Sequence, residues 1–191
     1  MMDYPKMEDN QLWMLLVEGD KNALKEIYYR HYNLLYHYGL KFCGNEESVK
    51  DCIHDIFLKI FNNKHLAAIT YVRTYLLKSL KNLLLEEARK KENFNREEFN
   101  DKIDIVEDEL SDVAFFKQDD EALRLSLRIA KAYKQLNKNQ QQIIYLRFVK
   151  ELSFNEIADL LGINVQSAMN LSSRTIAKIR SILTNDNLKI E

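Results

Sequence analysis

The chain contains only one proline and four glycines in 191 residues, and this scarcity constrains its fold more than any other feature. Tight turns and strand connections depend heavily on these two residues, whereas helix interiors exclude them. We therefore predict an all-α protein. The glycines at positions 19, 39, 44 and 162 are also too scattered for a glycine-rich loop. That spacing excludes P-loop and dinucleotide-binding motifs.

The segment from Phe154 to Leu171 has the packing pattern of a helix-turn-helix, a unit that places a helix in the major groove of DNA. Ser153 to Glu156 forms a capping-box pattern, Gly162 stands at the turn, and Asn164 can cap the second helix. Small or apolar residues that let the two helices cross are Ile157, Ala158, Leu161, Ile163, Ala168 and Leu171. A generic helical hairpin is the alternative interpretation.

Apolar periodicity divides the chain into two small helical domains joined by an acidic linker. In the N-terminal domain, residues 1–91, we predict helices over residues 10–18, 20–42, 45–61 and 70–91. The third of these is predicted to bury Val49, Cys52, Ile53, Ile56, Phe57, Ile60 and Phe61. The C-terminal domain, residues 122–191, is predicted to have one helix from residue 123 to about 136, followed by the helix-turn-helix unit.

The formal net charge of −1 hides a strongly uneven distribution. Residues 1–91 carry a net charge of +2, residues 92–121 carry −9, and residues 122–191 carry +6. Because the local field matters more than the total, the two basic ends remain compatible with nucleic-acid binding. We interpret residues 92–121 as a flexible acidic linker, with an additional acidic helix packed on either domain as the alternative.

The predicted fourth helix has a second face that combines aromatic, basic and amide side chains at helical spacing. Its members are Tyr71, Tyr75, Lys78, Asn82 and Arg89. Aromatic rings stack on unpaired bases while cations hold the phosphates, so this face suits single-stranded nucleic acid. The alternative is that the tyrosines are half-buried core residues and the cations only solvate the surface.

The predicted third helix has an unusual face opposite its apolar side, formed by Asp51, His54, Asp55 and Leu58. An exposed leucine beside carboxylates suggests a protein partner with a basic and partly apolar surface. A solvated acidic face is the alternative.

We find no catalytic set, and we expect neither an enzymatic activity nor a cofactor. The histidines lie on different helical turns and have no nucleophile motif beside them. Cys52 and His54 are too few to ligate a metal. The two cysteines do not form a disulfide framework, and no signal peptide or membrane-spanning run is visible. We therefore expect a cytoplasmic protein that does not insert into the membrane.

These motifs resemble those of the bacterial RNA polymerase sigma factors, in the extracytoplasmic-function subfamily. The resemblance covers roughly residues 10–91 and 123–184. Val49 to Ile60 looks like the polymerase-binding helix of the family. Tyr75 to Asn82, followed by Ala88 to Lys90, resembles its promoter-melting segment, and Leu136 onward is similar to its promoter-reading domain.

The resemblance implies that the chain binds core RNA polymerase and promoter DNA, both as a duplex and as a melted strand, and is restrained by an anti-sigma factor. Asp51, His54, Asp55 and Leu58 would dock on the polymerase clamp helices. Tyr75, Lys78, Asn82 and Arg89 would contact the minus-ten element, and the loop over residues 62–70 would shape a base pocket. The residues that would face the minus-thirty-five element are Gln166, Ser167, Asn170, Ser173 and Arg174.

The chain differs from the family at Met169 and Leu171, where basic residues are frequent, so we expect weaker phosphate attraction there. Two other interpretations of the whole chain stay open. One is a conventional helix-turn-helix regulator with an N-terminal sensor or dimerisation domain. The other is a helical adaptor that is phosphorylated on His31 or His54.

Overall fold

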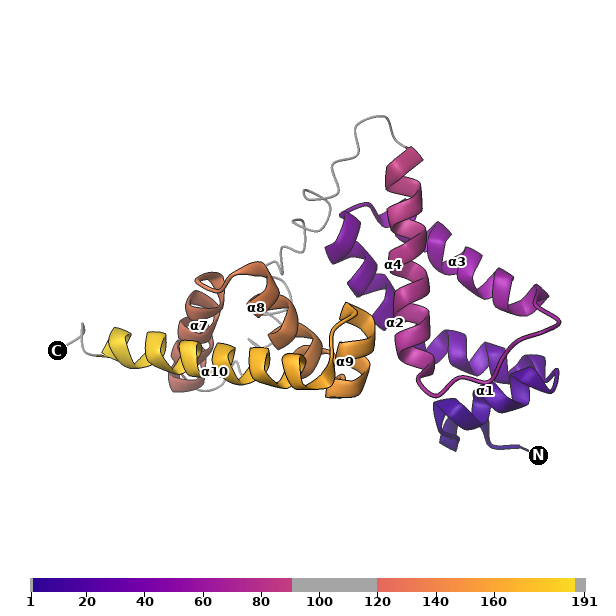
Figure 1. The fold of residues 1–191 in the computed structure, drawn as a ribbon, viewed down its shortest axis with the longest axis horizontal. Coiled ribbons are helices and arrows are strands. Elements are labelled where there is room, and N and C mark those ends of the chain that lie inside the picture. The colour runs from indigo at the N-terminus through magenta and orange to yellow at the C-terminus, as the bar shows by residue number, and fades with distance from the viewer. Residues whose placement is uncertain (1, 91–119, 188–191) are drawn as a thin grey trace. The chain divides into compact units, whose positions relative to one another are not determined.

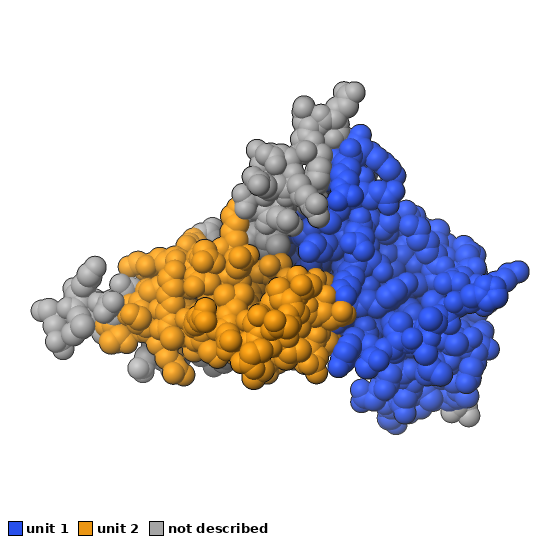
Figure 2. All heavy atoms as spheres, viewed as in Figure 1, with its two compact units in different colours: residues 1–102 blue, residues 103–191 orange. Residues whose placement is uncertain are grey.

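The structure is a computed structural model that describes residues 2–90 and 120–187. These residues form helices and no β-strand, which confirms the predicted all-α class. The chain divides into two compact units, residues 1–102 and residues 103–191 (Figure 2). The predicted acidic linker lies outside the described residues, apart from the two acidic residues that begin α7. None of the described helices is long and apolar enough to cross a membrane.

In residues 2–90, the described part of the first unit, the chain forms a short 3-10 helix and four α-helices (Figure 1). Their bounds are η1 Tyr4–Lys6, α1 Asp9–Val17, α2 Lys21–Cys43, α3 Glu46–Asn62 and α4 Val72–Lys90. The long helix α2 packs against the other three α-helices, and α3 also packs against α4. The four helices predicted from the sequence are all present.

Short polar side chains and a glycine set the helix ends in this unit. The Asp20 carboxylate accepts a hydrogen bond from the Asn22 backbone N–H at 2.8 Å, which starts α2. The Asn45 side chain accepts one from the Ser48 backbone N–H at 2.8 Å, which starts α3. Between them, Gly44 has a φ of 68°, a left-handed conformation that costs glycine little and ends α2. The sequence therefore sets this connection locally.

The core of the first unit is formed by apolar residues from all four helices. Among its fully buried side chains are Leu12, Trp13, Ile27, Leu35, Ile53, Leu76, Leu77 and Leu80. The buried Gly39 of α2 faces Val49 of α3. A Cβ atom at position 39 would lie 2.7 Å from Val49 Cγ1. Glycine therefore permits this close contact.

A polar cluster fastens the N-terminal segment to α2. The Arg30 guanidinium donates hydrogen bonds to the Met7 carbonyl and to the Asp9 carboxylate, both at 2.8 Å. The other Asp9 oxygen lies 2.8 Å from Nε2 of His31. Burial opposes the ionisation of Asp9, but its bonds with His31 and Arg30 outweigh burial and lower the Asp9 pKa. The adaptor interpretation loses His31, because this side chain is buried and paired.

The second unit contains α7 Asp120–Lys134, α8 Lys138–Ile144, the π-helical turn η3 Tyr145–Val149, α9 Phe154–Leu161 and α10 Val165–Asn187. Helix α10 packs against α7, α8 and α9. Ile143, Leu146, Leu152 and Ile157 are fully buried and lie at the centre of the unit. A capping box starts α8, because the Asn137 side chain accepts from the Gln140 N–H and the Gln140 side chain accepts from the Asn137 N–H.

Candidate functional site

The face predicted on the fourth helix is present and lies away from the core. Tyr71 precedes α4, and its carbonyl accepts the Tyr75 backbone N–H at 3.0 Å. Tyr71 and Tyr75 are 41% and 37% exposed, Asn82 and Arg89 are exposed, and Lys78 is half-buried. The opposite side of α4 supplies buried leucines to the core. Two rings, two cations and one amide therefore share one surface of the helix, and the α4 stripe is our name for these five residues.

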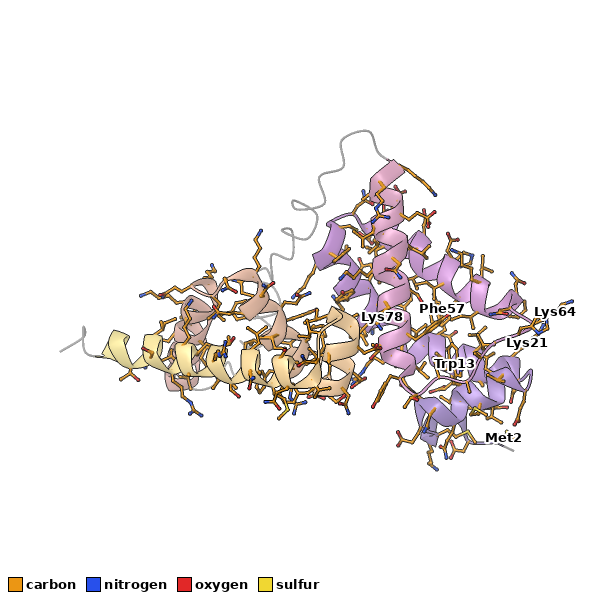
Figure 3. The ribbon with its side chains drawn as sticks, in the orientation of Figure 1. Met2, Trp13, Lys21, Phe57, Lys64 and Lys78 are labelled. Carbon is orange, nitrogen blue, oxygen red and sulfur yellow. The ribbon has the colours of Figure 1, made fainter. Side chains whose placement is uncertain are left out.

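Trp13, which the sequence analysis did not single out, organises the beginning of this stripe. This residue belongs to α1, and its ring is fully buried on the side of α1 that faces the start of α4 (Figure 3). The indole N–H donates a hydrogen bond to the Ala67 carbonyl at 2.9 Å. The ring also meets the Tyr75 ring edge-on, with centroids 5.3 Å apart. Trp13 therefore holds both the loop between α3 and α4 and one aromatic member of the stripe.

The four residues predicted on the third helix form an exposed ridge of α3 between two hollows. Asp51, His54, Asp55 and Leu58 are all exposed. His54 and Leu58 border an apolar groove of about 370 Å³ against α2, lined also by Tyr28, Tyr29 and Phe57. Asp51 and Asp55 border a charged cleft of about 230 Å³ against α4. One edge of this α3 ridge is thus apolar and the other charged.

The prediction that Phe61 is buried is wrong, because this side chain is 47% exposed. Its neighbour Ile60 in the same last turn of α3 is buried, so Phe61 lies on the side of the turn that the core does not cover. Phe61 instead lines the apolar groove, and the Lys21 ammonium lies 4.2 Å from the centre of its ring. The groove therefore has an aromatic wall with a cation at its rim.

Cys52 and His54 form no metal site in the structure, and the Cys52 thiol is poorly reactive. Cys52 is buried while His54 is exposed, so the two do not converge. Burial and the nearby Glu87 carboxylate raise the pKa of the Cys52 thiol to about 12. A thiol with so high a pKa stays protonated and is a poor nucleophile. No group of three potential metal ligands occurs among residues 2–90 and 120–187.

The helix-turn-helix predicted in the second unit is confirmed in its local geometry. Ser153 and Glu156 form the reciprocal capping box that starts α9. Gly162 ends α9 with a φ of 68°, and the Asn164 side chain accepts the Ser167 N–H at 2.7 Å at the start of α10. Ile157, Ala158 and Ala168 are buried, as expected for the crossing of α9 and α10. Ile163 is 38% exposed instead, because the turn carries it to the surface.

The first turns of α10 expose a polar face. Its residues Gln166, Ser167, Asn170, Ser173 and Arg174 are all exposed. Met169 is exposed with them, whereas Leu171 is half-buried. The expectation that these two positions attract phosphates weakly stays a prediction. We call this surface the α10 face.

Comparison with known protein families finds a match in each of the two units. The fold is that of a helical protein with a helix-turn-helix in its second unit. Residues 27–94 match the family description "Sigma-70 region 2", and residues 132–181 match "Sigma-70, region 4". The two matches together take in more than half of the chain, and the chain belongs to the sigma-70 family. The region 2 match argues against a sensor or dimerisation domain at the N-terminus.

A solved structure shares the fold. It is described as "Structure of CnrH in complex with the cytosolic domain of CnrY", and it is similar to this chain with a TM-score of 0.55 and 20% sequence identity. The similarity covers 93% of this chain and 98% of the other. Comparison with curated protein sequences gives no significant match.

Proposed function

We propose that this sigma-70 protein is an initiation factor of the extracytoplasmic-function class, which binds core RNA polymerase and directs it to promoters. One observation carries the proposal. The region 2 match takes in the α3 ridge and the α4 stripe, and the region 4 match takes in the α10 face. All three surfaces therefore lie within the two segments that match sigma-70 regions 2 and 4. The factor needs no catalytic group, because the polymerase performs the chemistry.

Stabilisation of the melted strand is assigned to the α4 stripe. Stacking on an aromatic ring contributes about 1–3 kcal/mol per base, and unstacking a base costs a few kcal/mol. Two rings therefore offset the cost of flipping about one base. The Tyr75 ring is already oriented by Trp13, so less conformational freedom is lost when a base stacks on it. Lys78 and Arg89 would hold the phosphates of the same strand.

Polymerase binding is assigned to the α3 ridge. The carboxylates of Asp51 and Asp55 suit a basic partner, and the apolar groove beside Leu58 suits an aliphatic side chain of that partner. CnrH binds the cytosolic domain of CnrY. By analogy, we assign to this chain a restraining partner of the anti-sigma type.

The α3 ridge is tested by its association with core polymerase. Asp51→Ala with Asp55→Ala should abolish co-purification of the chain with core polymerase, because the two carboxylates are the charged part of the ridge. Asp3→Ala with Glu18→Ala removes the same charge from exposed positions elsewhere in the first unit and serves as the control. Normal co-purification of the ridge variant would remove this surface from the proposal.

The α4 stripe is tested by separating promoter binding from promoter opening. Asn82→Ala should reduce the reactivity of promoter thymines toward permanganate more strongly than it reduces closed-complex binding in a gel shift. Asn33→Ala, which removes an exposed amide from α2, is the control. Equal losses in the two assays would mean that the stripe does not act on the melted strand.

A further inference from the structure

The exposed face of α10 has a composition that distinguishes between base pairs. Gln166, Met169, Asn170, Ser173 and Arg174 follow the spacing of one helix face. Ala168, Ser172 and Thr175 are buried on the other side, so the helix has one orientation relative to its unit. In a helix-turn-helix, the N-terminal residues of the second helix contact the base edges. The side chains nearest that end are therefore the ones that read sequence.

The amide groups of Gln166 and Asn170 are bonded to each other. Nε2 of Gln166 donates to Oδ1 of Asn170 at 3.0 Å, and both residues are exposed. This bond leaves one carbonyl of the pair as an acceptor and one NH₂ group as a donor. The same is true when both amides are turned over, because the pair then exchanges roles. Adenine presents an N6 donor beside an N7 acceptor in the major groove, and it is the base that amide side chains pair with in bidentate fashion.

Met169 lies between these two amides along the chain and is 41% exposed. An exposed, flexible thioether has no polar partner to satisfy on a base edge. The C5-methyl group of thymine is the apolar feature of the major groove, and apolar side chains contact it. A methionine beside an adenine-reading pair therefore favours a thymine nearby.

The distribution of charge on α10 also favours A·T over G·C pairs near its N-terminus. From Val165 to Ala177, Arg174 is the only charged residue. It stands eight residues after Gln166, about 12 Å further along the helix axis. Guanine presents two acceptors, O6 and N7, and is read most often by arginine or lysine. The first two turns of α10 offer no such cation.

We propose that the first turns of α10 select adjacent A·T pairs, with the Gln166–Asn170 amide pair reading adenine and Met169 contacting a thymine methyl group. This inference rests on the proposed function, because it names the base pairs that the α10 face reads within a promoter. Substitution of either amide should lower the preference for A·T over G·C at one position by roughly fivefold to 150-fold.

The test is a selection with the full chain bound to core polymerase. The probe is a pool of linear duplexes that carry a randomised segment of about 20 base pairs, two helical turns, upstream of a fixed A·T-rich segment. Native protein is compared with Gln166→Ala, Asn170→Ala and Met169→Ala. Ser181→Ala, an exposed change about four turns further along α10, is the control. Co-elution of the chain with core polymerase is recorded separately and reports on the proposed function.

The selected duplexes are then resynthesised with single-atom changes. Replacing adenine by 7-deaza-adenine removes N7 and should weaken binding of the native protein but not of Asn170→Ala or Gln166→Ala. Replacing thymine by uracil removes the methyl group and should weaken binding of the native protein but not of Met169→Ala. Enrichment of G·C pairs, no enrichment, or an A·T preference that the three variants keep would each overturn the inference, even where the polymerase complex forms normally.

Discussion

Trp13→Phe should impair promoter opening more than it impairs promoter binding. The substitution removes the indole N–H that donates to the Ala67 carbonyl at 2.9 Å. It also replaces the indole, whose centroid lies 5.3 Å from that of the Tyr75 ring, by a smaller ring. A hydrogen bond of this kind contributes about 0.5–1.5 kcal/mol to stability. An edge-to-face aromatic pair contributes about 0.5–1.5 kcal/mol beyond its buried area.

The magnitude follows from these contributions and from the space left by the smaller ring. Complete truncation of a buried tryptophan costs about 3–5 kcal/mol. Phenylalanine keeps part of the ring contact, so we expect a loss of about 2 kcal/mol in the free energy of unfolding, measured by urea denaturation. The fold survives this loss. The loop after α3 and the Tyr75 ring become less constrained, and a base that stacks on Tyr75 must then order the ring as well.

The assay pairs permanganate reactivity of promoter thymines with gel-shift binding of the polymerase complex. Phe42→Leu is the matched control, because it removes a ring that is 1% exposed in the same unit and that stacks on Tyr38 beneath the Lys81 ammonium. We expect both variants to lose stability and only Trp13→Phe to lose opening. If both variants open the promoter equally well, Trp13 is only a packing residue and the reasoning is refuted.

Two further predictions concern the packing and the pH response of the first unit. Gly39→Ala should destabilise the chain by about 1 kcal/mol in urea denaturation. The new methyl group overpacks Val49 at a cost of about 1–3 kcal/mol, which outweighs the gain of about 1 kcal/mol in helix propensity. In a Val49→Ala chain the same change should stabilise the fold, and a loss of stability there would contradict the argument. Asp9→Asn should lower stability near neutral pH, and its difference from the native chain should shrink below about pH 4. A carboxyl with a lowered pKa stabilises the fold above its unfolded-state pKa and loses that contribution as the pH falls through its folded-state value. A difference in unfolding free energy between the two chains that stays constant in urea titrations down to pH 3 would therefore contradict the role given to the Asp9 cluster.

The features predicted best from the sequence are those that depend on neighbouring residues. The caps at Ser153 and Asn164 and the turn at Gly162 follow from short-range hydrogen bonds and backbone conformation, and each has the expected geometry. The α4 stripe and the α3 ridge follow from helical periodicity. All their members except the half-buried Lys78 are exposed, which confirms the faces, while their roles stay proposals.

The features missed depend on contacts between residues far apart in the chain. Trp13 and Ala67 are 54 positions apart, and no pattern in α1 indicates that its tryptophan reaches the loop before α4. Phe61 fits the apolar period of α3, but periodicity does not show which apolar positions the neighbouring helices cover. The apolar groove between α2 and α3 could not be predicted either, because it depends on how two helices pack together. The only available signal was that Trp13 is the single tryptophan of the chain.

Run-off transcription with the purified chain and core RNA polymerase, on fragments of genomic DNA from the organism that encodes it, tests the central claim most directly. The account predicts transcripts that start at defined positions, require this chain, and disappear when Asp51→Ala is combined with Asp55→Ala. A folded chain that yields no start-site-specific transcript on any fragment would contradict it.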